Sequence, residues 1–293
     1  MSLIIFLIFH VVGGDPAYQM AGKYASAEQV QSLRQELGTD KPLLIQYFGF
    51  LSQIISFNWG NSWQTSQSVL QMIGLAMGPT LSLSLPSFIV GLLISLLISI
   101  KSLKSKQSHT NELVSVLCLA LMSISFVAYI IIFQYLFAYK LDLFPVNGWD
   151  PSLLKRWPYL FLPWIIAMLV ALGPNILLFR SLLKKEMEQD YVVTALAKGL
   201  SLERTLWHHI LRNSLLPIST AISLQIPFLI TGSILLEAFF GIPGMGSLLI
   251  EAIQSADLPV IKAITVLGAL VYILVNLITD IFYTVLDPKV TLQ

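Results

Sequence analysis

The run PTLSLSLPSFIVGLLISLLISI, from Pro79 to Ile100, decides the fold class because it contains no charged residue and ends only at Lys101. A helix needs about 20 apolar residues to cross the hydrocarbon core of a bilayer. A run of this length and composition is therefore typical of a membrane-spanning helix, and the pattern recurs along the chain.

Four further runs of this kind cover residues 113–138, 157–179, 213–236 and 263–286, of which the last contains one charged residue, Asp280. Residues 1–12 are apolar too, but they are too few to cross a bilayer alone. We interpret them as a genuine first span whose N-terminal half is missing, in preference to a signal-peptide core or a stub that does not span. The sequence thus predicts an all-α integral membrane protein with six transmembrane helices.

Composition supports this class. The chain has 293 residues, of which 56% are hydrophobic and 11% charged, and its net charge is +1. A soluble domain carries about 25% charged residues, and a nucleic-acid binder needs a basic excess. These values exclude a soluble enzyme, a disordered chain and a nucleic-acid binder. The single cysteine, Cys118, excludes an intrachain disulfide, and four scattered histidines exclude a Cys/His zinc cage.

The distribution of Lys and Arg predicts the orientation. These residues are denser in the predicted inner segments 101–112, 180–212 and the tail after residue 286 than in the outer segments. We therefore expect both termini in the cytoplasm. The chain divides into a partial first span (1–12), an extracytoplasmic segment with short helices (13–78) and a core transmembrane domain (79–293).

The outer segment after the first span carries its own helices. Ser26 and Gln29 fit a capping box and Gly38 a helix stop, which predicts a helix over residues 27–37. Residues 43–57 show helical spacing with a polar stripe, which favours an interfacial or packing helix. The following stretch contains two tryptophans and fits either a docking surface or an anchor in the headgroup region.

The longest inner loop, residues 180–212, predicts two helices joined by a sharp turn. Residues 184–198 are mostly helix-forming, Gly199 is a suitable C-cap, and Ser201 is a suitable N-cap for a second helix over residues 202–215. The first helix forms a compact, partly apolar surface in a loop that should face water. The residues leave two alternatives open: the loop folds back on the bundle, or a partner covers it.

The stretch DYVVTALAKGLS, from Asp190 to Ser201, is followed by HILRNSLLP, from His209 to Pro217. Further motifs occur in order along the chain: Gly14-Asp15-Pro16, Glu36-Leu37-Gly38, Trp59-Gly60-Asn61-Ser62, Pro243-Gly244-Met245-Gly246 and Asp287-Pro288-Lys289. This series resembles the ABC importer permeases of the dipeptide, oligopeptide and nickel transport family, in which the two stretches form the coupling-loop signature. The resemblance covers nearly the whole chain.

Two features of the coupling loop agree with the peptide and nickel branch of this family. Val193-Thr194-Ala195 stands where the general importer signature begins Glu-Ala-Ala, and the gap from Gly199 to Pro217 is longer than in the general signature. Residues 1–12 depart from the family pattern, because its members usually have a longer and basic entry into the first span.

The resemblance implies a type I ABC importer permease fold with a cytoplasmic coupling helix in the loop 180–212. The residues implied to couple to the ATPase are Tyr191, Thr194, Ala195, Ala197, Lys198, Gly199 and Ser201. The sequence has no Gly-x-x-x-x-Gly-Lys-Ser/Thr loop, so we expect no enzyme activity and no cofactor in this chain. ATP and Mg would be bound by partner subunits.

The implied partners are a second homologous permease, two ATP-binding subunits, an extracytoplasmic solute-binding protein and membrane lipid, but no nucleic acid. The implied location is the bacterial inner membrane. The implied substrates are di- or oligopeptides or a related small solute such as a nickel complex.

Three polar residues in or beside the spans, Glu237, Asn276 and Asp280, are candidates for gate or structural contacts. A charge at mid-span costs about 2.5–3.5 kcal/mol on insertion scales. Because of this cost, an acid within a span is a candidate for function. The alternative function is a proton-coupled secondary transporter that uses Asp280. A single acid argues against a proton relay. An intramembrane protease has the least support, because the spans lack paired catalytic residues.

Overall fold

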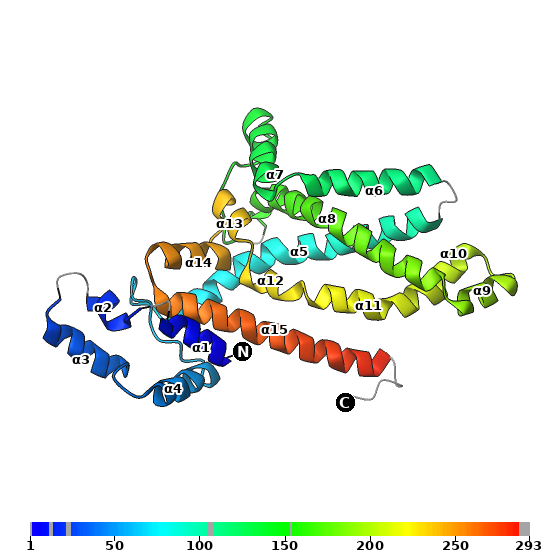
Figure 1. Cartoon of the computed structure of the whole chain (residues 1–293). Helices are drawn as coiled ribbons and strands as arrows, with labels where there is room; N and C mark the ends of the chain where they lie inside the picture. Colours follow the sequence, from blue (N-terminus) through cyan, green and yellow to red (C-terminus); the bar gives the residue numbers. More distant parts are fainter. Residues whose placement is uncertain (1, 12–13, 22–24, 105–107, 153, 287–293) are drawn as a thin grey trace.

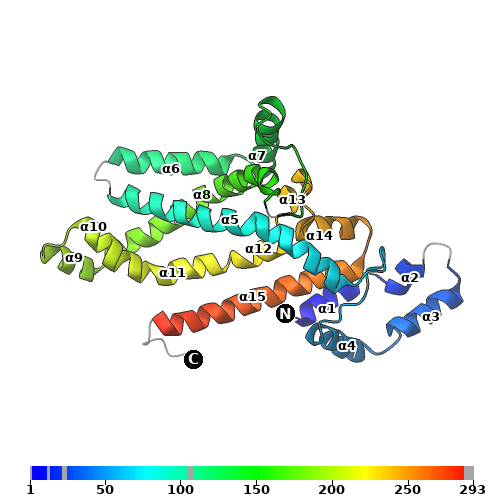
Figure 2. The same ribbon diagram turned by 180° about the vertical axis from the view of Figure 1, so that it is seen from behind.

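The computed structural model of the chain describes residues 2–11, 14–21, 25–104, 108–152 and 154–286. The motif Asp287-Pro288-Lys289 and the predicted inner tail lie outside these residues. The frame consists of three long helices, α5 (Val69–Lys104), α8 (Trp157–Met187) and α15 (Leu258–Leu286). The shorter helices α11 (Leu211–Ser223) and α12 (Ile226–Thr231) follow one another along this frame (Figures 1 and 2).

By length and apolar composition, four helical stretches can cross a membrane: Val69–Lys104, Trp157–Met187, Leu202–Phe240 and Leu258–Ile281. A pair of helices bent by 86°, His109–Ser123 and Phe126–Lys140, gives a fifth if it counts as one span. The predicted first span corresponds to α1 (Ser2–Val11), a helix of 10 residues. The count of six spans stays a prediction.

The run 113–138 differs from the straight helix that its composition suggests. The structure divides it into α6 (Ser108–Ser123) and α7 (Phe126–Phe133), which continues into the π-helical segment η1 (Gln134–Lys140). Ser125 begins α7 in an extended conformation, and its Oγ accepts a hydrogen bond from the N–H of Ala128 at 3.2 Å. A serine that caps a new helix competes with continuation of the old one. Figure 1 shows α7 turned across the direction of α6.

Small residues allow α5 and α8 to pack closely. Gly91, Ser95 and Ser99 follow one another on one face of α5, where both serines are fully buried. Each serine hydroxyl donates to the carbonyl four residues earlier at 2.7 Å, and Ser99 also donates to the carbonyl of Ile176 on α8 at 3.2 Å. Short side chains that satisfy their own polar atoms let two helix backbones approach inside a membrane.

The elements with a predicted role lie at opposite ends of the bundle. Figures 1 and 2 place α9 (Asp190–Ala197) and α10 (Leu202–Thr205) at one end, together with the end of α5 and the start of α6. At the other end lie α2 (Pro16–Ala21), α3 (Ala27–Leu37) and α4 (Leu43–Ile55). The two loops predicted to be cytoplasmic are therefore on the same side of the bundle.

The predicted capping box at the outer segment is confirmed. The N–H of Gln29 donates to Ser26 Oγ at 3.3 Å, the N–H of Ser26 donates to Gln29 Oε1 at 3.0 Å, and Gly38 ends α3 with φ +70°. The next helix, α4, packs against α1 and α15 through a cluster of Phe50, Phe6 and Val266. Helices α1 and α4 thus rest on the last long helix.

Only a minority of the side chains in the candidate spans are fully buried inside the chain. In the most apolar window of each of the four candidate spans, at most 39% of the residues are buried. Apolar surface on this scale needs lipid or another subunit to cover it. The fold therefore fits a chain that is surrounded by membrane and by other membrane-embedded subunits.

We expect Gly173→Ala to lower the thermal stability of the purified protein, because α6 and α8 touch at this glycine. A Cβ at Gly173 would lie 2.9 Å from the carbonyl oxygen of Cys118 and 2.9 Å from Met122 Cγ. Overpacking of this kind costs about 1–3 kcal/mol. Gly74→Ala is the matched control, because a Cβ there meets nothing within 4 Å and alanine favours the helix. Size-exclusion after stepwise heating should separate the two variants, and equal stability would contradict the close α6–α8 contact.

Candidate functional site

The elbow between α9 and α10 has the local structure that the sequence predicts. Gly199 has φ +85°, a left-handed conformation that favours glycine. Ser201 then caps α10, and its Oγ accepts a hydrogen bond from the N–H of Arg204 at 3.3 Å. The helix continues through the π-helical segment η2 (Leu206–Ile210) into α11. The predicted first helix is divided, because Gln189 is extended and separates α9 from α8.

One face of α9 packs on the bundle. Val192 is 3% exposed and Ala195 is 8% exposed. Val192 belongs to a cluster with residues of three other elements: Ile100 of α5, Leu183 of α8, and Leu206 and Ile210 of η2. The small side chain of Ala195 therefore faces the chain's own helices. This face of α9 therefore folds back on the bundle, which is one of the two alternatives that the sequence leaves open.

A hydrogen bond ties the start of α9 to the end of α8. Burial raises the pKa of the Tyr191 hydroxyl. The hydroxyl donates to Glu186 Oε2 at 2.7 Å. The raised pKa keeps the hydroxyl protonated around neutral pH, so that it can donate this bond. Tyr191 thus connects the elbow to a long helix.

The other face of α9 is open. Val193 is 64% exposed and Leu196 is 41% exposed. The structure does not bring all seven predicted coupling residues to this surface, because Ala195 is buried and Tyr191 is half-buried. The remaining five are exposed: Thr194, Ala197, Lys198, Gly199 and Ser201. Sequence reasoning did not single out Val193 and Leu196 as contacts, although their spacing on one helix face is visible in the sequence.

Basic side chains lie beside the elbow. Arg204, His208, His209 and Arg212 line a shallow groove along α10, η2 and the start of α11. An exposed salt bridge of 2.7 Å between Lys104 and Glu203 connects α10 with the end of α5. An exposed pair of this kind contributes little to stability.

A second constellation lies at the other end of the bundle, around Glu237 of α13 (Ile234–Phe240). The Glu237 side chain is fully buried. Its Oε1 accepts a hydrogen bond from the Thr80 hydroxyl at 2.8 Å, and its Oε2 accepts from the N–H of Gly246 at 2.6 Å and of Ser247 at 3.1 Å. The Thr80 hydroxyl in turn accepts from the N–H of Met245 at 2.7 Å.

These contacts cap α14 (Met245–Gln254). The first N–H groups of a helix have no partner within the helix, and its N-terminus favours negative charge. The N-cap residue, Gly244, has no side chain and makes no side-chain cap. Thr80 of α5 and Glu237 of α13 supply the missing acceptors. The carboxylate therefore joins three helices, as a structural contact; motion of Glu237 as a gate stays a prediction.

Glycines leave room for this carboxylate. A Cβ at Gly244 would lie 2.5 Å from Glu237 Oε2, and one at Gly232 would lie 2.6 Å from Glu237 Oε1. Gly232 also has φ +82°. Sequence reasoning named Glu237 but missed Thr80 and Gly232, which lie far from each other along the chain and carry no motif of their own.

The remaining predicted polar residues lie on α15. The Asn276 amide donates to the carbonyl of Tyr272 at 2.9 Å, and Asp280 is exposed near the end of the helix. The structure thus does not bring them to the Glu237 site. Within the described residues, no group of three or more His, Cys, Asp or Glu side chains is placed to hold a metal ion.

We expect Glu237→Ala to destabilise the protein strongly, because each buried donor left without an acceptor costs about 1–3 kcal/mol. Glu237→Gln should have an intermediate effect, since the amide keeps one acceptor oxygen but directs N–H groups at other donors. Glu251→Gln, at an exposed position of α14, is the control and should leave the unfolding temperature unchanged. A wild-type unfolding temperature for Glu237→Ala would show that the carboxylate does not hold this end together.

Comparisons with known proteins agree with this architecture. The family model for the binding-protein-dependent transport system inner membrane component matches residues 80–292, and the model for the N-terminal part of such membrane components matches residues 1–84. The chain is 30% identical to the "Probable peptide ABC transporter permease protein y4tP" of Sinorhizobium fredii, over 99% of this chain and 94% of the relative. It is 31% identical to the glutathione transport system permease protein GsiC of Salmonella typhimurium, over 99% of this chain and 93% of the relative. The chain belongs to the family of inner membrane permease components of binding-protein-dependent ABC transport systems.

Proposed function

We propose that this chain forms part of the translocation path of an ABC importer for peptides or a related small solute, such as glutathione or a nickel complex. It would act with a second homologous permease, two ATP-binding subunits and an extracytoplasmic binding protein. The family assignment and the names of the relatives, which include peptide and glutathione permeases, support this proposal. They favour an ATP-driven importer over the proton-coupled alternative that would use Asp280.

The observation that carries the proposal is the open apolar face of α9. Val193 and Leu196 are exposed on a helix that stands at the tip of the bundle, beside charged groups. Full burial of a side chain of this size stabilises by about 1.5–3 kcal/mol. A partner that covers both side chains gains this energy, and in this proposal the partner is the ATPase.

The buried face of α9 offers a route by which movement of the ATPase reaches the spans. Val192 packs in one cluster with Ile100, Leu183 and Leu206, which belong to α5, α8 and η2. The bond between Tyr191 and Glu186 adds a polar connection to α8. A helix held in this way moves with its neighbours as a rigid body, as alternating access requires.

The two faces divide the predicted coupling residues by role. Thr194 and Ala197 would contact the ATPase together with Val193 and Leu196, which the sequence did not single out. Ala195 would keep α9 close to the bundle. Gly199 would set the angle between α9 and α10. The end of the bundle that carries the elbow would face the cytoplasm, which is the side that the Lys and Arg distribution predicts for the loop and for both termini.

Replacing Gly199 should uncouple transport from ATP hydrolysis. A β-branched residue in the left-handed region costs about 1–3 kcal/mol, so Gly199→Val would change the angle of the elbow. We expect the complete importer in vesicles to hydrolyse ATP but to lose substrate uptake. Gly199→Asn should retain most uptake, because asparagine tolerates this conformation. Gly38→Val is the matched control, since Gly38 has φ +70° at the opposite end; normal uptake in Gly199→Val would argue against the elbow's role.

Charge on the open face of α9 should weaken assembly with the ATPase. Val193→Asp and Leu196→Asp each place an acid where an apolar contact is proposed, and we expect less ATPase to co-purify with the permease. Leu154→Asp is the control, because Leu154 is 86% exposed outside the elbow. If all three variants retain the ATPase equally, the open face is not the docking surface.

A further inference from the structure

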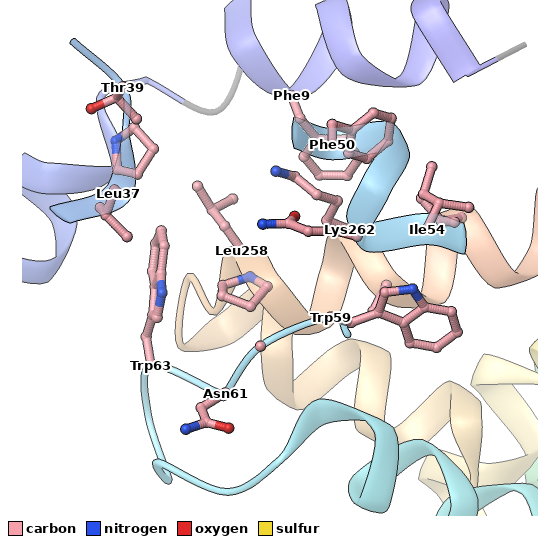
Figure 3. Close-up of a pocket in the computed structure, with 16 residues that line it drawn as sticks. Phe9, Leu37, Thr39, Phe50, Ile54, Trp59, Asn61, Trp63, Leu258 and Lys262 are labelled. Atoms are coloured by element: carbon pink, nitrogen blue, oxygen red, sulfur yellow. The ribbon is translucent and has the colours of Figure 1, made fainter. Parts of the chain in front are cut away.

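A cavity of about 290 Å³ lies at the end of the bundle opposite the elbow. Its walls come from α4, from the stretch 59–63 and from the first turns of α15, and Phe9, Leu37 and Thr39 complete them (Figure 3). The side chains are mainly aromatic and aliphatic, with a few polar groups; those that matter here are Phe50, Gln53, Trp59, Asn61, Trp63 and Lys262.

Buried hydrogen bonds join two walls of the cavity, the stretch 59–63 and the start of α15. Asp257, which is 3% exposed, precedes α15. Its carboxylate accepts a hydrogen bond of 2.5 Å from the Ser62 hydroxyl and one of 3.2 Å from the N–H of Trp63. The stretch with the two tryptophans is thereby fixed to the start of α15.

Lys262 brings a positive charge to this wall. Its Nζ lies 5.5 Å from the centre of the Phe50 ring. Among the described residues, no carboxylate forms a salt bridge with Lys262. The ring attracts the half-buried ammonium and offsets part of its desolvation cost, and an anion or water beside it would offset the rest. Lys262 therefore provides an attractive position for an anion.

A second donor near this cavity also lacks a partner. The indole nitrogen of Trp59, another wall residue, is buried, and within the described part of the chain its N–H has no acceptor. Natural structures rarely leave a buried donor without an acceptor. Because this nitrogen is buried, it is closed to a ligand in the cavity, and Lys262 is the donor that such a ligand would meet.

Carboxylates nearby do not satisfy Lys262. It also borders an adjoining cavity that contains Asp15 and Asp40. Asp15 is engaged with Arg34 at 2.6 Å, and Asp40 is exposed. The aromatic cavity itself has no acid among its wall residues.

We propose that this cavity binds the carboxylate and the adjacent apolar side chain of a small ligand, with Lys262 as the charge partner. The choice of a peptide C-terminal residue as this ligand rests on the proposed function. The single positive charge matches the single charge of a carboxylate. The volume lies at the lower end of small-molecule sites, and the aromatic walls suit an apolar side chain.

Equilibrium binding of radiolabelled N-acetyl-leucine to the complete importer in phosphatidylcholine nanodiscs tests the site. N-acetyl-leucinamide is the matched competitor, because it lacks only the charge. We expect the acid to bind and the amide to compete at least tenfold less well. Lys262→Gln should weaken binding of the acid about ten- to hundredfold, as loss of a hydrogen bond to a charged group does. Lys262→Arg should retain binding, and Lys155→Gln, at an exposed outer position, should not change it.

Equal competition by acid and amide, or unchanged binding in Lys262→Gln, would overturn the proposal. Nanodiscs that contain phosphatidylglycerol form the second arm. If this lipid stabilises the wild type but not Lys262→Gln, while the acid does not bind, the occupant is a lipid headgroup and the peptide proposal is wrong. ATP-dependent uptake is measured separately, so a failure of the importer function is distinguishable from a failure of the carboxylate site.

Discussion

A helix that begins inside the protein, away from water, must find acceptors for its first N–H groups, and this requirement organises one end of the bundle. At α14 the acceptors are the Glu237 carboxylate and the Thr80 hydroxyl, which come from two other helices. The cost of an unsatisfied donor in a low-dielectric region makes this arrangement specific. Because α14 leads directly to α15, the same contact also positions the start of the last long helix.

The opposite end depends on a different physical property, the separation of a buried and an exposed face on one short helix. Val192 and Ala195 hold α9 to the bundle, while Val193 and Leu196 remain open. Helix α5 connects the two ends, because it carries Thr80 in the capping site and Ile100 in the cluster beneath α9. With a rise of 1.5 Å per residue, these two positions are about 30 Å apart along a single rigid element. In the proposed mechanism, α5 would carry a displacement at the elbow to the far end.

The cavity at Lys262 and the capping site lie at the same end of the bundle, but they are formed by different residues. The capping site is closed and fully satisfied, whereas the half-buried Lys262 of the cavity forms no salt bridge among the described residues. Closed, satisfied polar groups are typical of structure, and open, unsatisfied ones are typical of ligand sites. One end of this molecule thus combines a rigid part with a part that has the chemistry for binding.

Local patterns in the sequence predicted the membrane class, the helix that Ser26 begins and Gly38 ends, and the elbow at Gly199. Each prediction depends on neighbouring residues: the length of an apolar run, a capping side chain or a left-handed glycine. These patterns did not predict the bend at Ser125, because a new helix begins there inside a continuous apolar run. They also did not predict that Ala195 faces the bundle. Thr80 and Glu237 are 157 residues apart in sequence, and only the packing of α14 against both α5 and α13 makes them one site. A contact between distant segments leaves no periodic trace in either segment, so tertiary structure alone assigns it.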